Sequence, residues 1–304
     1  MGTATVVEAA RRALGPAGVF MPFSTASAPS ADEQRETARR LEDAGYRAAW
    51  TNEAVGGKDA LVQLAVLLAA TERMVFGTGI ANIWARAPQT AHGAAALLAQ
   101  AFPDRLVLGL GVGYPSQAAS VGREFGSPVA TMRGYLEQMS APTQLPAPDV
   151  TYPKVVGANG PRMLALAGEI ADGAMPAMVP PEFTAQARRI LGPDKLLIVG
   201  LAFVADTDLS RAKPAARQRV AGRLSMPGTY AATMARLGYS DQEITEVSDR
   251  LVDEIVGYGD AAAITAKVRE HLAAGADHVI LMPAAAGVTD GVEQLEQLAP
   301  AINF

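Results

Sequence analysis

The sequence predicts an α/β protein folded as a (β/α)8 TIM barrel, and three observations support this prediction. Short apolar runs that suit β-strands alternate regularly with longer segments that suit helices. The alternation repeats eight times, which is the number of repeats in a closed barrel. The 304 residues are 49% apolar and have no break in composition that would divide the chain into two domains. An open doubly wound sheet is the competing architecture.

Eight segments have the composition of parallel strands. Their apolar runs are continuous rather than alternating, which is typical of strands buried on both faces of a sheet. The eight predicted strands are Gly18–Ser24, Tyr46–Asn52, Met74–Ile80, Arg105–Leu110, Lys154–Gly157, Gly173–Met178, Lys195–Ala205 and Asp277–Met282.

A predicted helix follows each of these strands. The helix Ala31–Ala44 has clear limits, because Ser30 can cap its start, Glu33 follows three residues later and Gly45 can end it. The other predicted helices are Asp59–Glu72, Pro88–Ala101, Pro128–Met139, Pro161–Ile170, Pro181–Leu191, Asp260–Ala274 and Val288–Leu298.

Two segments depart from the regular alternation. The Pro-rich stretch Pro142–Asp149 is interpreted as a connector within the barrel. The segment Leu209–Val256, after the seventh strand, is mostly helical. We interpret the chain as one domain, residues 1–304, with a helical insertion at about residues 207–258 that is placed to cover the mouth of the barrel.

Composition excludes several classes of protein. The net charge of −5 without a broad basic excess argues against a nucleic-acid binder. The absence of cysteine excludes disulfides, thiol catalysis and Cys-ligated metals. The N-terminal segment does not resemble a signal peptide, and no window approaches the ~18 uninterrupted apolar residues of a membrane span. We therefore expect a cytoplasmic protein.

The active face of such a barrel lies at the C-terminal ends of its strands, and those ends carry few acid–base groups. Glu53 is the only carboxylate among them. His92, His271 and His278 fall on helices or at the start of a strand, where a structural role is favoured. No cluster suited to a metal is predicted. A site of this kind suits a cofactor that supplies its own reactivity.

Glycines gather at three of these strand ends. They form the clusters Gly77-Thr78-Gly79, Gly109 to Gly113, and Gly157-Ala158-Asn159-Gly160-Pro161. Small residues at strand ends let a flat ligand approach the backbone. The third cluster opens a helix and could hold a phosphate, although an ordinary βα turn is the favoured interpretation of its spacing. The second cluster lacks the GxGxxG spacing of a dinucleotide site.

Several longer segments carry a family resemblance. GYRAAWTNEA, TGIANIWARAPQTAH, FPDRLVLGLGVG and VVGANGPRMLALAGEIADGAM together resemble the bacterial luciferase-like superfamily. Within it, the chain resembles the branch that uses the deazaflavin coenzyme F420, which is common in actinobacteria. The resemblance covers nearly the whole chain. It implies a (β/α)8 barrel, usually a homodimer, with the deazaflavin or a flavin at the C-terminal face.

The resemblance also implies site residues. It places a non-prolyl cis peptide at Gly79–Ile80, in a bulge that backs the ring of the cofactor. It assigns Glu53 as an acid near the ring, a candidate for both cofactor binding and catalysis. The remaining cofactor-binding residues that it implies are Thr78, Gly79, Ile80, Asn82, Gly111, Val112, Gly113, Ala158, Asn159 and Gly160.

Two positions depart from the sugar-phosphate dehydrogenases of this branch. Those enzymes have a His after the acid of strand 2 and a Glu after the glycines of strand 4, where this chain has Ala54 and Tyr114. Such a dehydrogenase activity is therefore not expected. Tyr114 is a candidate catalytic residue that could donate a proton, and an aromatic wall of the pocket is an equally favoured role.

Further side chains could line the site. Trp84 and Arg86 could wall the substrate side, or cap the following helix. Three methionines near strand ends suggest an adaptable apolar pocket, although core filling is the commoner role. The methionines are Met175, Met178 and Met282.

The anionic tail of the cofactor, a phosphate and a glutamate chain, needs local positive charge. The candidates are Arg86, Arg123, Lys154 and Arg162, and the run Arg211, Lys213, Arg217, Arg219 and Arg223. A solvated helix face is the favoured interpretation of that run.

The leading hypothesis is a coenzyme F420-dependent oxidoreductase that transfers a hydride to or from a small, mostly apolar organic substrate. Two alternatives stay open: an FMN-dependent luciferase-like monooxygenase, and a non-catalytic deazaflavin-binding protein.

Overall fold

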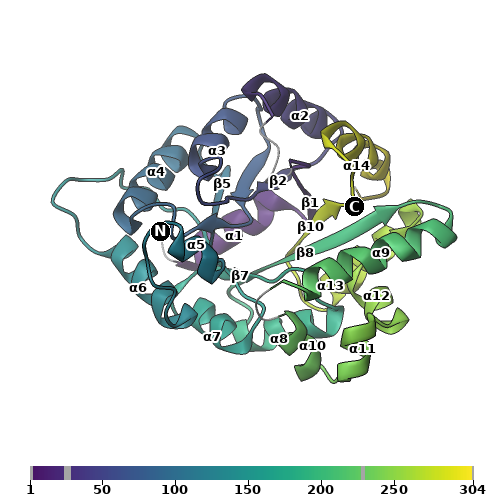
Figure 1. The fold of residues 1–304 in the computed structure, drawn as a ribbon. Helices are drawn as coiled ribbons and strands as arrows, with labels where there is room; N and C mark the ends of the chain where they lie inside the picture. Colours follow the sequence, from purple (N-terminus) through teal and green to yellow (C-terminus); the bar gives the residue numbers. More distant parts are fainter. Residues whose placement is uncertain (1–2, 24–28, 227–229, 303–304) are drawn as a thin grey trace.

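The computed structural model describes residues 3–23, 29–226 and 230–302. In this part of the chain, eight parallel strands close into a barrel (Figure 1). Strand β10 closes it by pairing with both β8 and β1, and its longest register runs from His278 opposite Ile198 to Pro283 opposite Phe203. The barrel strands are β1 (Ala17–Phe20), β2 (Ala48–Thr51), β3 (Val75–Thr78), β5 (Leu106–Gly111), β6 (Lys154–Gly157), β7 (Gly173–Met175), β8 (Leu196–Ala205) and β10 (His278–Pro283). The predicted (β/α)8 barrel is confirmed.

Helices surround the barrel as predicted. Ser30 accepts a hydrogen bond from the Glu33 N–H at the start of α2, as the sequence suggests. The surrounding helices are α2 (Ala31–Asp43), α3 (Ala60–Leu68), α4 (Pro88–Ala101), α6 (Pro128–Ser140), α7 (Pro161–Ile170), α8 (Pro181–Leu191), α13 (Ala261–Ala273) and α14 (Val288–Ile302). Within the described ranges, no helix has both the length and the apolar character needed to cross a membrane.

The structure differs from the sequence prediction mainly at strand ends and in short elements. The predicted strand Gly18–Ser24 ends at Phe20, and Ser24 lies outside the described residues. The apolar runs continue past the last ladder pairing because strand-end residues turn into the mouth of the barrel. The short elements that the sequence did not predict are β4 (Ala81–Asn82), α5 (Pro115–Ala119) and β9 (Gly257–Gly259), which pairs with the end of β8.

An unpredicted helix, α1 (Thr3–Leu14), closes the N-terminal end of the barrel. Its residues Val7, Ala10 and Leu14 are buried in one cluster with Trp50 and Ile280 from the barrel strands. The sequence pattern here mixes charged and apolar residues, because one face of the helix packs on the barrel while the other meets solvent.

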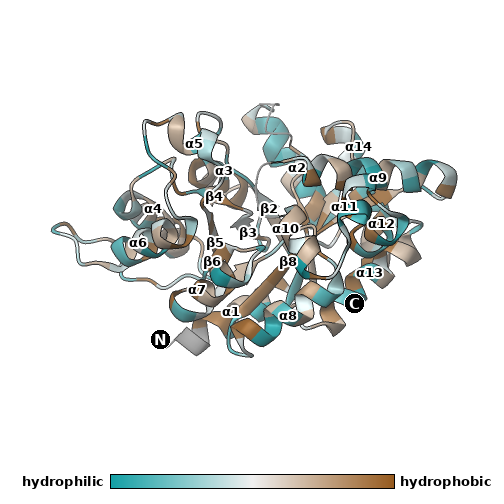
Figure 2. Cartoon of the chain, turned by 60° about the horizontal axis from the view of Figure 1, so that its bottom comes forward, coloured by the Kyte–Doolittle hydropathy of each residue, from teal (hydrophilic) through white to brown (hydrophobic). Residues whose placement is uncertain are grey.

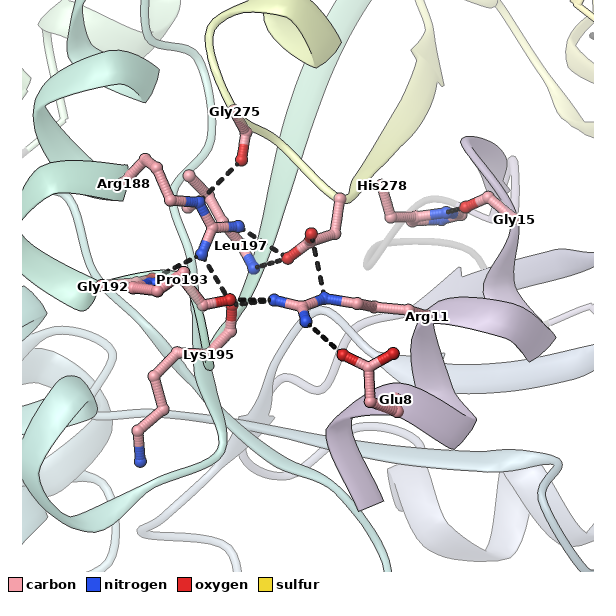
Figure 3. A network of polar contacts seen from close by, with 11 residues as sticks. Glu8, Arg11, Gly15, Arg188, Gly192, Pro193, Lys195, Leu197, Gly275 and His278 are labelled. Carbon is pink, nitrogen blue, oxygen red and sulfur yellow. Dashed lines mark hydrogen bonds and ion pairs between the residues drawn. The ribbon is translucent and has the colours of Figure 1, made fainter. Parts of the chain in front are cut away.

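A network of ion pairs fixes α1 to the strand ends beneath the barrel (Figure 3). Asp277 accepts hydrogen bonds from Arg11 Nε at 3.1 Å, from Arg188 Nη2 at 2.7 Å and from the Leu197 N–H at 2.8 Å. Arg11 also pairs with Glu8 at 2.7 Å. One carboxylate therefore joins α1, α8 and the start of β8, at the end of the barrel opposite the mouth.

His278 lies buried beside this network. Its Nδ1 lies 2.8 Å from the Gly15 carbonyl oxygen, and Trp50 Nε1 donates to its Nε2 at 3.1 Å. A Cβ at Gly18 would lie 2.8 Å from that Nε2, so the close fit requires glycine there. Burial lowers the pKa of His278 to about 4, although the Gly15 carbonyl and Asp277 act in the opposite direction.

The insertion after β8 consists of four helices. They are α9 (Leu209–Leu224), α10 (Tyr230–Arg236), α11 (Asp241–Glu246) and α12 (Asp249–Ile255). Figure 1 shows them together on one side of the barrel, next to α8 and α13, and Figure 2 shows hydrophilic residues along the outer helices α9 and α12. The predicted helical character of this segment is confirmed.

The buried His278 predicts an acid-sensitive stability. Between pH 6.5 and about 4 the unfolded chain binds a proton at this ring that the folded protein excludes, so the free energy of unfolding falls as the pH falls. The slope from one such group is at most about 1.4 kcal/mol per pH unit. We expect His278→Gln to reduce this slope in urea titrations across that window.

The control for this prediction is His92→Gln. His92 is less buried and contacts the Tyr152 hydroxyl at 2.8 Å, so we expect its loss to change the slope less. An unchanged slope in His278→Gln would contradict a neutral buried ring.

Candidate active site

The third strand is interrupted where it reaches the mouth of the barrel. The peptide bond between Gly79 and Ile80 is cis, as the sequence comparison predicts, and the chain then pairs again as β4. The Gly79 N–H donates to the Thr51 carbonyl oxygen at 2.7 Å, and the Glu53 N–H donates to the Ile80 carbonyl oxygen at 3.0 Å. The bulge is therefore held by the end of β2.

The glycines of β5 and β6 make room for the side chain of Ile80. A Cβ at Gly111 would lie 2.6 Å from Ile80 Cγ1, and a Cβ at Gly157 would lie 3.2 Å from Ile80 Cγ2. Gly113 has a positive φ of 56°, and a Cβ there would lie 2.7 Å from Asn82 Nδ2. The absence of side chains at these glycines lets the bulge pack directly against its two neighbouring strands.

Thr78 holds β3 to β5 rather than facing the mouth. It is fully buried, and its hydroxyl donates to the Gly109 carbonyl oxygen at 2.6 Å and accepts from the Gly109 N–H at 2.9 Å. The hydroxyl of Thr78 therefore both donates and accepts a hydrogen bond within the protein. This predicted site residue holds the bulge in position.

Glu53 is the buried centre of the β2 end. Its carboxylate accepts hydrogen bonds from the N–H groups of Ala60 at 2.9 Å and Asn82 at 2.8 Å, and both of its oxygens bond the guanidinium of Arg86. The side chain of Glu53 is 2% exposed and that of Arg86 is 9% exposed. Four hydrogen bonds, two to each oxygen, therefore engage the carboxylate within the protein.

Arg86 forms ion pairs with two carboxylates, because it also contacts Asp59 at 2.8 Å in addition to Glu53. Burial acts to lower the pKa of Arg86, but its hydrogen bonds to Glu53 and Asp59 outweigh burial and raise it. Asp59 caps α3 by accepting from the Leu61 and Val62 N–H groups. Arg86 therefore serves the scaffold and is no longer a candidate for the anionic tail of a cofactor.

Asn82 has an amide group without a partner. Its Oδ1 accepts from the Trp84 N–H at 3.0 Å, while its buried Nδ2 has no hydrogen-bond partner among the residues that the structure describes. Trp84 in turn donates from Nε1 to the Val112 carbonyl oxygen at 2.7 Å, which ties the bulge to the end of β5. A buried donor left unpaired costs about 1–3 kcal/mol, so it indicates a place where a ligand can supply an acceptor.

The loop after β6 is pinned from two sides. The Asn159 side chain donates to the Ala177 carbonyl oxygen and accepts from the Ala177 N–H. The Asn159 carbonyl oxygen accepts from Thr233 Oγ1 at 2.6 Å and from Arg236 Nη2 at 3.4 Å. Helix α10 of the insertion thus lies on the loop Ala158–Gly160, a contact that no spacing in the sequence indicates.

Tyr114 reaches the same part of the mouth. Its hydroxyl lies 4.0 Å from Met226 Sδ, and its N–H donates to Gln117 Oε1 at 2.9 Å. The pKa of Tyr230 is raised by burial and further by Tyr114, whereas Arg223 and Asn159 lower it. Tyr114, Tyr230 and the β6 loop therefore lie close enough to influence one another.

The other predicted basic and apolar residues are scattered. Lys154 opens β6 at the far end of the barrel, where it lies 5.9 Å from the Tyr152 ring. Arg123 and Arg162 are exposed. Met175 and Met178 are buried, and Met282 is half-buried.

One lysine that the sequence did not single out lies at the β2 end. A cavity of about 350 Å³ is lined by residues that include Ala54, Lys58, Asp59, Ala85 and Val121. Burial lowers the pKa of Lys58, and its ammonium lies 5.2 Å from the centre of the Phe23 ring. Ala54, which stands where related dehydrogenases have a His, leaves this space open.

Comparisons with known proteins identify the family of this chain. The family model described as luciferase-like monooxygenase matches residues 16–278. A 5,10-methylenetetrahydromethanopterin reductase of Methanolobus tindarius is 28% identical over 213 residues, which is 60% of this chain and 65% of that protein. A Mycobacterium tuberculosis protein named as a coenzyme F420-dependent oxidoreductase, a name that is itself provisional, is 27% identical over 86% of this chain and 93% of its own.

A solved structure shares the fold over nearly its full length. It is an F420-dependent secondary alcohol dehydrogenase in complex with an F420–acetone adduct, with a TM-score of 0.72 and 17% identity. The match covers 95% of this chain and 99% of the dehydrogenase. At this identity the likeness supports the barrel fold, and the chemistry of this chain has to be argued from its own residues.

The hydrogen bonds of Glu53 predict that its substitution lowers the stability of the fold. Glu53→Gln replaces a filled carboxylate by an amide whose NH2 group faces the donors of Arg86, so we expect the free energy of unfolding to fall by about 3 kcal/mol in urea. The control is Glu169→Gln, which removes an exposed ion pair with Arg133, and we expect it to change stability little. Unchanged stability in Glu53→Gln would contradict the structural role.

Proposed function

Because the chain belongs to the luciferase-like monooxygenase family, we propose that it is a coenzyme F420-dependent oxidoreductase. It transfers a hydride between the deazaflavin and a small, mostly apolar organic substrate. The observation that carries this proposal is the bulge at Gly79–Asn82, where glycine backbone and one unpartnered buried amide meet at the strand ends. The names of one relative and of one structural neighbour include coenzyme F420. The other relative is named as a reductase.

The residues present fit a flat ring with an anionic side chain. Gly79 and Ile80 back the ring, Gly111 to Gly113 lie at its edge, and Asn82 Nδ2 donates to a polar atom of the ligand. The N-terminus of α7, directly after Ala158–Gly160, offers backbone N–H groups that lack partners within the helix and suit a phosphate. We therefore assign the β6 loop to the phosphate side of the cofactor.

The cofactor supplies the hydride chemistry when it is bound, and the protein supplies position and shelter. Glu53 and Arg86 act as positioning residues, because their buried pair fixes the bulge without a free acid or base. Tyr114 is the polar side chain at the mouth that can donate a proton to a substrate. The insertion α9–α12 excludes water from the phosphate side.

The residues at positions 54 and 114 limit the kind of reaction that we propose. Ala54 and Tyr114 replace the His and Glu with which the related sugar-phosphate dehydrogenases act on an alcohol. Reduction of an activated C=C or C=O bond asks less of the side chains, since one proton donor is enough. We therefore propose reduction of such a bond, with Tyr114 as that donor.

The test of the cofactor is a binding experiment with two chromophores. Purified protein is titrated into coenzyme F420 and, separately, into FMN, while the fluorescence anisotropy of each ring is recorded. We expect a response to the deazaflavin and a much weaker one to FMN. Tight FMN binding without any response to the deazaflavin would overturn the proposal and favour the monooxygenase that the family description names.

The second alternative, a non-catalytic deazaflavin-binding protein, is separated by turnover. Reduced coenzyme F420 is mixed with the protein and a panel of enones and ketones, and the return of the oxidised absorbance is followed. Binding without substrate-dependent oxidation across the panel would favour the non-catalytic protein.

We also propose that the chain acts as a homodimer. The adjacent helices α3 and α4 leave Val62 and Leu97 exposed at 64% and 58%, and such apolar residues are suited to an interface. A monomer mass in light scattering at micromolar concentration would contradict this.

Asn82 provides a mutational test of the cofactor site. Asn82→Ala removes the unpartnered Nδ2, which is stabilising, and also the acceptor for the Trp84 N–H, which is destabilising. Because the two effects oppose each other, we expect little change in the melting temperature of the ligand-free protein. Deazaflavin binding should weaken about tenfold, which corresponds to about 1.4 kcal/mol. Unchanged affinity in a normally folded variant would place the ring elsewhere.

Tyr114→Phe separates the two roles of that residue. If the hydroxyl donates a proton, the rate of reduction of 2-cyclohexen-1-one, taken as a probe enone, should fall about 100-fold while KM changes little. A changed KM with an unchanged kcat would instead identify the ring as a wall of the substrate pocket.

A further inference from the structure

The basic run of α9 divides into two groups according to its partners. Arg211 pairs with Asp206 and Asp208, Lys213 with Asp249 and Asp253, and Arg217 with Asp249. These three cations are neutralised by the insertion itself. The two cations nearest the end of the helix, Arg219 and Arg223, have no carboxylate partner in the described residues.

Arg219 and Arg223 lie four residues apart, so their side chains share one face of α9. The Arg223 guanidinium lies 5.0 Å from the centre of the Tyr230 ring, and its Nη1 donates to Met226 Sδ at 3.6 Å. Surrounding protein atoms lower the pKa of Arg219, and the positive charge of Arg223 lowers it further, although Arg219 keeps access to solvent. The four-residue spacing places two like charges on one face of the helix, and an anion bound there would offset their repulsion.

Arg223 lies near the end of β5 at the mouth of the barrel, and Arg219 lies one turn earlier on the same helix. Met226 and Tyr230, the neighbours of Arg223, are also the neighbours of Tyr114 at the end of β5. Tyr230 opens α10, whose Thr233 and Arg236 bond the Asn159 carbonyl oxygen in the β6 loop. A chain leaving Ala158–Gly160 toward solvent therefore passes α10 and the end of α9.

We propose that Arg219 and Arg223 form a binding site for the anionic tail of the cofactor, its phosphate and glutamate carboxylates. This inference rests on the proposed function. It assigns the insertion a role in recognition as well as in covering the mouth. It also explains how an acidic protein with a net charge of −5 holds an anionic coenzyme, because the positive charge is local and unpaired.

The pairing pattern separates Arg219 and Arg223 from the other cations of α9. Arg211 and Lys213 are balanced by carboxylates from the segment before the helix and from α12, which among the described residues of α9 leaves only the end of the helix able to bind a ligand anion. Guanidinium groups bind phosphate and carboxylate through paired, charge-assisted hydrogen bonds, and Arg223 keeps most of its donors free while its ring contact with Tyr230 orients it.

The experiment compares two forms of the deazaflavin. The complete coenzyme and the same chromophore carrying only its ribityl chain, without phosphate or glutamate, are titrated by fluorescence anisotropy. The proteins are the wild type, the double variant Arg219→Gln/Arg223→Gln, and the control Arg211→Gln from the same helix. Melting temperatures confirm that each variant is folded.

We expect the wild type and Arg211→Gln to prefer the complete coenzyme, and the double variant to lose at least tenfold of that preference with unchanged affinity for the tail-less form. A double variant that keeps the full preference overturns the arginine site and leaves the proposed function standing. Equal binding of both forms by the wild type also overturns the arginine site and leaves the proposed function standing. A wild type that binds neither form overturns the proposed function, and the tail site with it.

Discussion

The buried carboxylate of Glu53 is the constraint on which the mouth of this barrel depends. It receives the guanidinium of Arg86, the first N–H of α3 and the N–H of Asn82. These donors come from three separate segments, so one charge fixes the end of β2, the start of α3 and the bulge after β3 together. An ion pair so deeply buried contributes little net stability compared with apolar packing, but removing one partner is costly. The role of the Glu53–Arg86 pair is to hold the end of β2, the start of α3 and the bulge in one fixed arrangement.

The two ends of the barrel use buried charge differently. At the closed end, Asp277 binds two arginines, and the neutral His278 ring fills the space under Gly18. These groups are saturated with partners, which suits a stable floor. At the mouth, Asn82 Nδ2 lacks a hydrogen-bond partner in the described residues. Arg219 and Arg223 lack a carboxylate partner there, although Arg223 contacts Met226 and the Tyr230 ring. His271 Nε2 on α13 and Gln294 Oε1 on α14 also lack partners in the described residues, so what distinguishes Asn82 Nδ2 is its position beside the bulge.

The insertion after β8 connects the two halves of the proposed site. Helix α10 contacts the β6 loop through Thr233, and the end of α9 reaches Tyr114 through Met226. These contacts place the phosphate side of the proposed cofactor site beneath helices that belong to no barrel repeat.

The sequence by itself determined the barrel and its eight repeats, because continuous apolar strands and glycine-rich strand ends are local features of the chain. The position of the bulge followed from the family resemblance of these segments. The sequence also identified Glu53, Asn82 and Arg86 as residues of the mouth. Tertiary structure alone decided what these residues do. Glu53 is a filled anchor rather than a free acid, since its four donors are up to 33 residues away in the sequence. The division of the α9 cations into paired and unpaired ones likewise depends on Asp249 and Asp253, which come from another helix. Hydrogen bonds and charges act through space. Spacing along the chain could therefore predict neither the role of Glu53 nor which cations of α9 are paired.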